Sequence, residues 1–402
     1  MIDISDVEIV DFHAHRMSKS SLSEVVKAYA SRHDNNIETE LKWPHWRGFF
    51  NYLAKIYECN PTLEEIEREL SRRYEGDFLE CIRSVLDREK IVKVQIVSDT
   101  DSLEGVGEFP KERCVWAICT NGMMDPDWAK DADATRIDEV LAAIDMELDV
   151  AIKNGCSCLK NILCYNRSLS VDVGVTKADA DKAYQRLRKT QPVSRAERQW
   201  SLPLSKEAKP TYFGFVKPPT YEDTTDIRSL QVYQDYLVKY LTIRAGELGL
   251  PYAFHTGAGT TPTYDLRDAN PQNLLPLLYD HDVNAAGTKI VILHSGVPFI
   301  NVAAAIASIL KNVYVDSSWP TQTTIVRDIF KYNLELNPPT KILYGTDSFW
   351  IPERLAHGAW NARKQLTGVL SELNKCGWSE EECMEIAKLV LAKNAKKLLN
   401  IP

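Results

Sequence analysis

The stretch Asp11-Phe12-His13-Ala14-His15 directly follows the apolar run Val7-Glu8-Ile9-Val10, and the interpretation of the whole chain begins there. The apolar run predicts a short buried strand. Side chains alternate along a strand with a period of two, so both imidazoles of a His-x-His sequence lie on one face. Two neutral imidazoles side by side form half of a site for a divalent metal. Because such pairs also occur as core or surface histidines, the other ligands must be found elsewhere in the chain.

Length and composition describe a globular protein. The chain has 402 residues, enough for one large barrel or two ordinary domains, and 44% of them are hydrophobic and 26% charged. These values argue against disorder. The formal net charge of −8 argues against nucleic acid as a partner, because phosphate binding needs a basic patch.

Cysteine usage and the absence of targeting signals predict a cytoplasmic protein. The nine cysteines show no disulfide framework, and Cys156-Ser157-Cys158 lie within an apolar run, so reduced thiols are expected. The N-terminus has no basic region followed by an apolar core, and no run of about eighteen apolar residues is present. We therefore expect no signal peptide, no membrane span and no membrane partner.

Short apolar runs alternate with segments of helical pattern along most of the chain. Seven runs after the first predict strands, at 92–97, 114–119, 156–162, 250–255, 289–294, 313–316 and 341–347. Helical spacing of apolar residues is clear at 134–153 and 230–248. Eight short strands separated by helices predict an α/β fold, a closed parallel (β/α)8 or TIM barrel, in which consecutive strands are neighbours.

An open, doubly wound sheet is the competing fold. That fold would have a Gly-x-Gly-x-x-Gly turn after its first strand, where this chain has His13-Ala14-His15. The glycines of Thr256-Gly257-Ala258-Gly259-Thr260 follow the fifth strand and lack the third glycine. We therefore favour the barrel.

Two connections are too long for ordinary loops. Residues 18–90 are mostly helical in pattern and include the aromatic stretch 42–50, which either packs onto the body or caps a pocket with His45 or Arg47. We predict a single domain over 1–402 with a helical insertion at about 18–90. The second connection, from about 171 to 225, is highly charged. Its segments 185–189 and 194–198 are predicted to be solvated helix faces.

Polar residues that can bind metal or transfer protons end five of the predicted strands. They are His13 and His15 on the first strand, Lys160 on the fourth, His255 on the fifth, His294 on the sixth and Asp347 on the eighth. The carboxyl ends of barrel strands meet at one mouth, where barrel enzymes assemble their sites. One strand-end histidine alone is more often structural than a ligand, but the matching positions of this set predict a functional site.

With this set, the chain resembles the amidohydrolase superfamily, and within it the amidohydrolase-related branch (amidohydrolase 2). That branch includes metal-dependent hydrolases, decarboxylases and the barrel domain fused to glutamine-synthetase-like proteins. The resemblance rests on the segments Val10–His15, Leu159–Arg167, Phe254–Gly259, Ile292–Ser295 and Leu343–Asp347. It covers the barrel from the first strand to the eighth and excludes the insertion.

The resemblance implies a metal centre. His13, His15, His255 and Asp347 would hold a divalent metal, and His294 would be a ligand of a second metal or a hydrogen-bond donor to substrate. These ligand types suit Zn²⁺ first, with Mn²⁺, Fe²⁺ or Ni²⁺ as alternatives, as one or two ions. Such a metal lowers the pKa of a bound water to about 7, and Asp347 would take the proton of that water as a base.

Lys160 has two interpretations. In members of the superfamily with two metals, the lysine at this position carries CO₂ as a carbamate and bridges the ions. An unmodified lysine would instead bind a substrate carboxylate or stabilise an oxyanion. We favour one metal and an unmodified lysine.

Basic and aromatic residues near the mouth predict an anionic substrate. Arg167 lies seven residues after Lys160, and guanidinium groups bind carboxylates and phosphates through paired hydrogen bonds. Arg16 and Arg354 either extend this cationic rim or form surface ion pairs. Trp319 and Trp350 either line the pocket or pack in the interior, and Trp350 is included among the candidate substrate contacts.

Together these residues predict a metal-dependent hydrolase of the amidohydrolase type that cleaves a C–N or C–O bond in a small, carboxylate-bearing molecule. Its catalytic groups would be Asp347, His294 and Lys160, and its substrate contacts Arg167, His294, Lys160 and Trp350. The first alternative is a decarboxylase or sugar-acid isomerase on the same site. The second is a catalytically silent, ligand-binding barrel. A barrel of this size is also compatible with a homo-oligomer.

Overall fold

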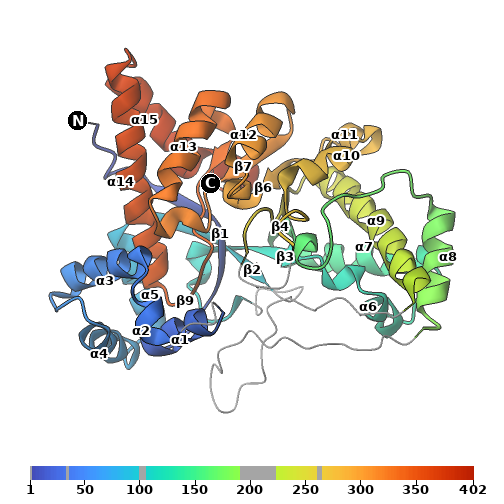
Figure 1. The fold of residues 1–402 in the computed structure, drawn as a ribbon, viewed down its shortest axis with the longest axis horizontal. Helices are drawn as coiled ribbons and strands as arrows, with labels where there is room; N and C mark the ends of the chain where they lie inside the picture. The colour runs from blue at the N-terminus through green and yellow to red at the C-terminus, as the bar shows by residue number, and fades with distance from the viewer. Residues whose placement is uncertain (1, 33–35, 99–105, 191–222, 260–264) are drawn as a thin grey trace.

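Nine parallel strands form the centre of the molecule (Figure 1). The computed structural model describes residues 2–32, 36–98, 106–190, 223–259 and 265–402. The strands follow one another in the order β8-β7-β6-β5-β4-β3-β2-β1-β9. Their bounds are β1 Ile9–Met17, β2 Ile91–Ser98, β3 Cys114–Cys119, β4 Cys156–Asn161, β5 Tyr252–Phe254, β6 Ile290–Ile292, β7 Val313–Asp316, β8 Ile342–Leu343 and β9 Ser348–Trp350.

The two ends of this strand order are joined by the chain itself. β8 and β9 are successive parts of one segment that is interrupted at residues 344–347, and β9 pairs with β1. Within the interruption, the Phe12 amide donates to the Tyr344 carbonyl at 2.9 Å and the Asp347 amide to the His13 carbonyl at 2.7 Å. The eighth strand segment therefore lies along the first strand, and the predicted TIM-barrel-like fold is confirmed.

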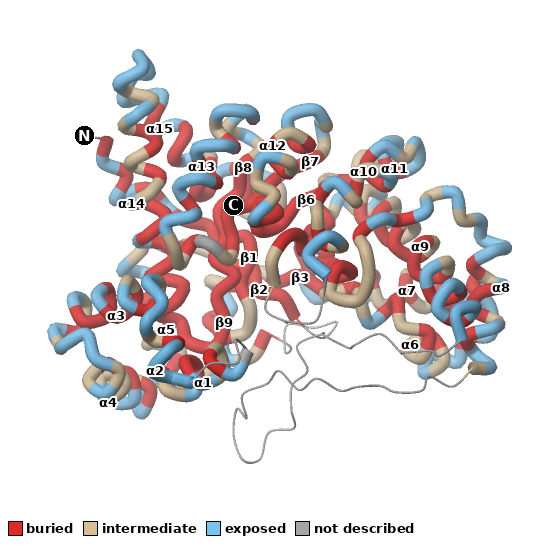
Figure 2. Tube along the Cα trace, in the orientation of Figure 1, coloured by how far each residue is buried: buried red, intermediate tan, exposed pale blue. Residues whose placement is uncertain are grey.

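A small apolar cluster fills the barrel below its mouth. Cys158 of β4 and Ala253 of β5 belong to this cluster, together with Ala395 of the last helix. Lys160 lies two residues beyond Cys158, so it projects on the same side of β4 and toward the carboxyl end of the strand. Figure 2 shows the buried residues running through the strands and the inner faces of the helices.

The connection after β1 is helical, as predicted. Its helices are α1 Leu22–Arg32, α2 Ile37–Glu40, α3 Pro44–Tyr57, α4 Leu63–Tyr74 and α5 Phe78–Arg88. Figure 1 shows them as one group beside β9. The rings of Trp46, Phe49 and Phe50 are buried, whereas Arg47 is exposed, so the aromatic stretch packs onto the body. Because these rings share one core with the outer face of the barrel, we propose that the chain folds as one domain.

The remaining helices cover the outside of the sheet (Figure 1). They are α6 Pro126–Asp131, α7 Ile137–Lys153, α8 Lys177–Leu187, α9 Thr224–Glu247, α10 Leu275–Leu278, α11 His281–Ala286, α12 Ile300–Ile309, α13 Ile325–Leu336, α14 Glu353–Lys375, α15 Glu380–Lys388 and α16 Asn394–Leu398. The predicted helices at 134–153 and 230–248 correspond to α7 and α9. The segment 185–189 includes the end of α8, and 194–198 lies outside the described residues. Among the described helices, none is long and apolar enough to span a membrane.

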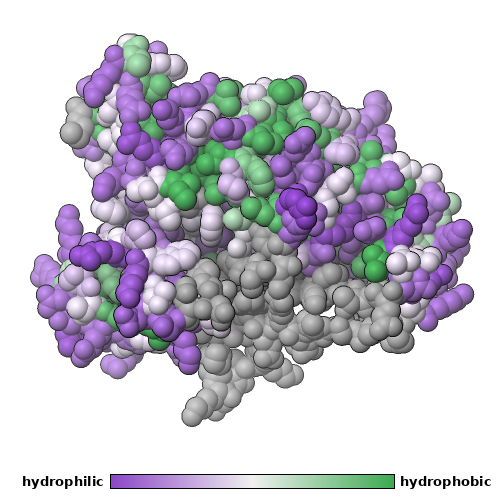
Figure 3. Space-filling view, viewed as in Figure 1, coloured by the Kyte–Doolittle hydropathy of each residue, from purple (hydrophilic) through white to green (hydrophobic). Residues whose placement is uncertain are grey.

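One face of the molecule carries exposed apolar side chains. Figure 3 shows hydrophobic residues gathered over the region of α12 and α13. Ile309 and Leu336, with 70% and 47% of their surface exposed, are among them. Exposed apolar patches occur at interfaces between proteins, and the homo-oligomer stays a prediction.

Arg363 of α14 ties this helix to the base of the barrel. Its guanidinium donates to the Glu89 carboxylate at 3.1 Å, to the Glu89 carbonyl at 2.7 Å and to the Val7 carbonyl at 2.8 Å. Both charged side chains of this pair are largely buried. Removing one partner of a buried pair leaves the other charge without compensation.

We therefore expect Arg363→Met to lower the free energy of unfolding by about 3 kcal/mol, measured by urea denaturation. Arg327→Met is the matched control. Arg327 of α13 also pairs with a residue of α14, Glu372, but that pair lies on the exposed surface. That variant should change stability by less than about 1 kcal/mol. Equal losses in the two variants would contradict the structural role of Arg363.

Candidate metal centre

Three metal-binding side chains converge where β1 meets the interruption between β8 and β9. His13 Nε2 lies 3.2 Å and His15 Nε2 3.0 Å from Asp347 Oδ1. Each of the three residues offers one ligand atom, and these atoms lie within 4.8 Å of one another. His13 and Asp347 are buried and His15 is partly exposed. Within the part of the chain that the structure describes, this is the cluster of His, Cys, Asp or Glu side chains whose geometry suits a metal ion.

The backbone holds Asp347 in an uncommon conformation. Its φ is +55°, in the left-handed region that non-glycine residues rarely occupy. The amide hydrogen bond to the His13 carbonyl, at 2.7 Å, holds this turn against β1. His294, at the end of β6, also has a positive φ of 61°. Such conformations persist only where the surrounding structure enforces them, and they concentrate at functional sites.

Two further histidines form a hydrogen-bonded pair beside this cluster. His294 Nε2 lies 2.9 Å from His255 Nδ1, and the Ser318 hydroxyl lies 2.8 Å from His294 Nδ1. The rings of His13 and His294 are 5.5 Å apart. His255 Nε2 is buried and has no hydrogen-bond partner among the described residues. If His255 Nδ1 donates to His294, this nitrogen keeps a lone pair that a ligand can use.

Lys160 lies between the two groups of histidines. Its Nζ is 3.4 Å from His13 Nε2, and the residue is 2% exposed. Burial lowers the pKa of Lys160, and the neighbouring Asp347 carboxylate opposes that shift. A buried amine with a lowered pKa is suited both to bind an anion and to react as the neutral base.

Electrostatics give the cluster the charge state that metal binding needs. Burial lowers the pKa of His13 and His255 well below their usual range and that of His294 to about 3. Burial alone would raise the pKa of Asp347. The charge interaction with His294 and the hydrogen bonds from His13 and His15 hold this pKa well below its usual value instead. Neutral imidazoles and an ionised carboxylate are the forms that bind cations.

Two buried aspartates that the sequence interpretation did not single out support these residues. Asp11 accepts hydrogen bonds from the His13 amide at 3.1 Å and from the Thr346 amide at 3.0 Å. Asp316 accepts one from the His294 amide at 2.5 Å. Burial raises the pKa of both carboxyl groups to about 7. Asp316 ends β7, so its position at a strand end was a signal that could have revealed it.

The structure places the predicted substrate contacts in different surroundings. The Arg167 guanidinium pairs with Asp235 of α9 at 2.6 Å and donates to the carbonyls of Ser170 and Gln231, so its donors serve the fold. Trp350 is 2% exposed and packs against the ring of Phe349.

Arg354 has different surroundings. It is 6% exposed, and its guanidinium lies 5.0–5.9 Å from the ring centres of Tyr29, Trp46 and Phe349. Within the described residues, no carboxylate forms an ion pair with it and its Nε has no hydrogen-bond partner. The Phe349 ring also lies 6.1 Å from the His15 ring. Among the described residues, Arg354 is therefore a buried cation without a counterion, and the Phe349 ring lies between it and the candidate metal cluster. Arg16 likewise has a buried Nε without a partner among the described residues.

The chain matches known proteins that share this fold. Residues 219–401 match the model of the family described as Amidohydrolase, which confirms the resemblance inferred from the strand-end residues. The protein FluG of Emericella nidulans is 27% identical over 163 residues, which are 38% of this chain and 17% of FluG. The chain thus spans less than a fifth of the length of that curated relative.

Several solved structures have the same architecture over nearly the whole chain. A protein from Lactobacillus casei assigned as a metal-dependent hydrolase is 16% identical, with a TM-score of 0.73, and covers 99% of this chain and 96% of its own. The uronate isomerase of Thermotoga maritima is 15% identical, with a TM-score of 0.69 and coverage of 98% and 95%. The glucuronate isomerase of Caulobacter crescentus is 11% identical, with a TM-score of 0.67 and coverage of 98% and 92%. At these identities the likeness shows a common fold.

Gly345 allows the segments around the cluster to approach one another. A Cβ atom at this position would lie 2.9 Å from Asp316 Oδ2, 3.0 Å from Ser318 Cβ and 3.3 Å from His13 Cβ. These atoms belong to buried residues of β1, of β7 and of the segment that follows β7, so they have little room to move.

We expect Gly345→Ala to lower the free energy of unfolding by about 2 kcal/mol through overpacking, measured by urea denaturation. Gly122→Ala is the control, since nothing lies within 4 Å of a Cβ built there, and it should leave stability nearly unchanged. If Gly345→Ala is as stable as the unmodified protein, the close approach of these segments is wrong.

Proposed function

We propose that the protein is a metal-dependent enzyme that hydrolyses a C–N or C–O bond in a small anionic molecule. The observation that carries the proposal is the convergence of His13, His15 and Asp347, with ligand atoms within 4.8 Å of one another at the carboxyl ends of the barrel strands. The donor set fits a divalent cation, and the unpartnered Nε2 of His255 is the candidate for a further ligand. Imidazole and carboxylate suit Zn²⁺ first, and Mn²⁺, Fe²⁺ or Ni²⁺ next.

A bound divalent cation supplies Lewis acidity, which polarises a substrate carbonyl and makes water a better nucleophile. In the proposed reaction, the Asp347 carboxylate accepts the proton of the attacking water, because its low pKa keeps it ionised. His294, whose ring nitrogens contact His255 and Ser318, positions the His255 ring at the same mouth. The Lys160 ammonium stabilises negative charge that develops on the substrate oxygen.

A second candidate, isomerisation of a sugar acid, is favoured by the likeness to uronate and glucuronate isomerases over almost the entire chain. On this alternative the same carboxylate and lysine would move a proton between adjacent carbon atoms of the substrate. A screen of N-acyl amino acids, lactones and uronates, followed by mass spectrometry, separates the reactions. Hydrolysis adds the mass of one water, shared between two products for an N-acyl amino acid and carried by one product for a lactone, whereas isomerisation leaves the mass unchanged and decarboxylation releases CO₂.

Metal analysis tests the centre directly. We expect the purified protein to carry one divalent ion per chain, and His13→Ala and Asp347→Asn to lose it, because each substitution removes one of only a few ligands. The readout is elemental analysis after equilibration with Zn²⁺ or Mn²⁺. His281→Ala is the control, since the side chain of His281 is 94% exposed on the surface. Absence of any bound divalent ion from the unmodified protein in every preparation would refute the metal-dependent function.

Arg354 is proposed to bind the anionic group of the substrate, since it is a buried cation with no described counterion close to His15. We expect Arg354→Met to raise KM for the substrate that the screen identifies by about a hundredfold, with a smaller change in kcat, because a charge-assisted hydrogen bond to the substrate is lost. Arg167→Met is the control. It should destabilise the contact with α9 and leave KM nearly unchanged, and the opposite pattern would restore Arg167 as the substrate contact.

A further inference from the structure

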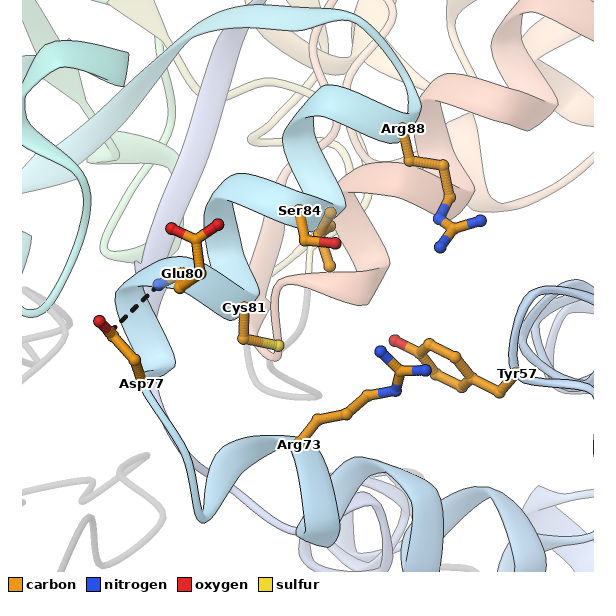
Figure 4. A pocket seen from close by; sticks show the side chains of 8 residues that line it. Tyr57, Arg73, Asp77, Glu80, Cys81, Ser84 and Arg88 are labelled. Atoms are coloured by element: carbon orange, nitrogen blue, oxygen red, sulfur yellow. Dashed lines mark hydrogen bonds between the residues drawn. The ribbon is translucent and has the colours of Figure 1, made fainter.

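A pocket of about 250 Å³ lies within the helical insertion, among α3, α4 and α5 (Figure 4). It is lined by Tyr57, Arg73, Asp77, Glu80, Cys81, Ser84, Val85 and Arg88. None of these residues belongs to the candidate metal centre. The pocket is therefore a separate feature of the segment that distinguishes this chain from a plain barrel.

Two arginines direct their charges into this pocket. Figure 4 shows the guanidinium groups of Arg73 and Arg88 pointing into the same space, with the Tyr57 ring and the Cys81 thiol beside them. The Arg73 guanidinium lies 4.1 Å from the centre of the Tyr57 ring. Its Nε is buried and has no hydrogen-bond partner in the described part of the chain. A buried donor without an acceptor costs free energy unless a ligand supplies one.

The nearby carboxylates have other hydrogen-bond or ion-pair partners, although the charge of Arg73 also acts on the buried Glu353. Asp77 caps α5 by accepting a hydrogen bond from the Glu80 amide at 3.2 Å, and Figure 4 shows it turned toward that helix end. Glu80 lies 3.5 Å from Arg83. The buried Glu353 accepts hydrogen bonds from the hydroxyls of Tyr57, at 2.9 Å, and Tyr74. Among the residues that the structure describes, none of these acids forms an ion pair with Arg73 or Arg88.

We propose that this pocket binds a small oxyanion, a carboxylate or a phosphate, between Arg73 and Arg88. Guanidinium groups bind both classes through paired, charge-assisted hydrogen bonds. The Ser84 hydroxyl on the same wall adds a neutral donor. The proposal is independent of the proposed hydrolase function, since no residue of the metal centre takes part in it.

Binding here would fasten α4 to α5 and thereby stabilise the insertion. Arg73 comes from α4 and Arg88 from the end of α5, so an anion held by both joins two helices. Tyr57, which Arg73 stacks on, donates to Glu353 at the first residue of α14. A ligand that binds only the folded state raises the free energy of unfolding, by an amount that grows with the logarithm of the ligand concentration above Kd.

Calorimetric titration of the full-length protein with inorganic phosphate and, separately, with succinate tests the proposal. We expect one of the two probes to bind, and Arg73→Gln and Arg88→Gln each to weaken it by about tenfold or more. Arg72→Gln is the matched control. Arg72 lies on α4 beside Arg73, but it is exposed and pairs with Glu69 at 3.0 Å. The titration is repeated with Arg354→Met. If the affinity for the probe is unchanged in this variant, the probe does not bind at the proposed substrate site.

Alkylation of Cys81 locates the bound anion. Cys81 lines the pocket, whereas Cys376 is exposed elsewhere on the molecule and serves as an internal reference. The bound probe should slow the reaction of Cys81 with iodoacetamide and leave that of Cys376 unchanged. Protection by phosphate assigns a phosphate ligand, and protection by succinate assigns a carboxylate. No protection by either probe, or equal protection in Arg73→Gln, overturns the proposal.

Discussion

The hydrogen bond from the Asp347 amide to the His13 carbonyl, at 2.7 Å, links closure of the barrel to construction of the candidate site. It joins the last strand segment to the first, across more than three hundred residues of chain. The same two residues bring a carboxylate and an imidazole together at 3.2 Å. The interruption between β8 and β9 therefore determines where the Asp347 carboxylate lies. A continuous strand would leave Asp347 in extended geometry, whereas the left-handed turn places its carboxylate between two histidines.

Several of the buried carboxylates at the site have defined hydrogen-bond partners. Asp11 is held by backbone and hydroxyl donors of Thr346, and Asp347 by His13 and His15. Lys160 lies within reach of the same carboxylate and moderates the excess of negative charge. A cation at the cluster would complete this balance, since three buried aspartates face one lysine and neutral imidazoles. Electrostatics and ligand geometry thus point to the same occupant.

Sequence patterns predict the parts of this structure that follow from local periodicity. The strands at 114–119 and 313–316 have the predicted bounds, because short apolar runs bounded by turns are local signals. The break at residues 344–347 was not predicted, since it arises from pairing with β1. Asp316 was not predicted as a site residue although it ends a strand, because its contact is with the backbone amide of His294 and such a contact leaves no local sequence pattern. The role of Arg167 could not be predicted, because its partner Asp235 lies on α9, far along the chain.

The barrel supplies the candidate metal ligands, and the insertion supplies part of the surroundings of Arg354. The substrate is therefore harder to infer than the type of reaction. The candidate metal ligands come from β1 and from the turn before β9, whose positions the barrel fixes. Two of the three rings around Arg354, those of Tyr29 and Trp46, come from α1 and α3 of the insertion. An exchange of these helices would change the surroundings of the cation and leave His13, His15 and Asp347 in place. Selectivity is therefore expected to vary with the insertion, and the type of catalysis with the strands.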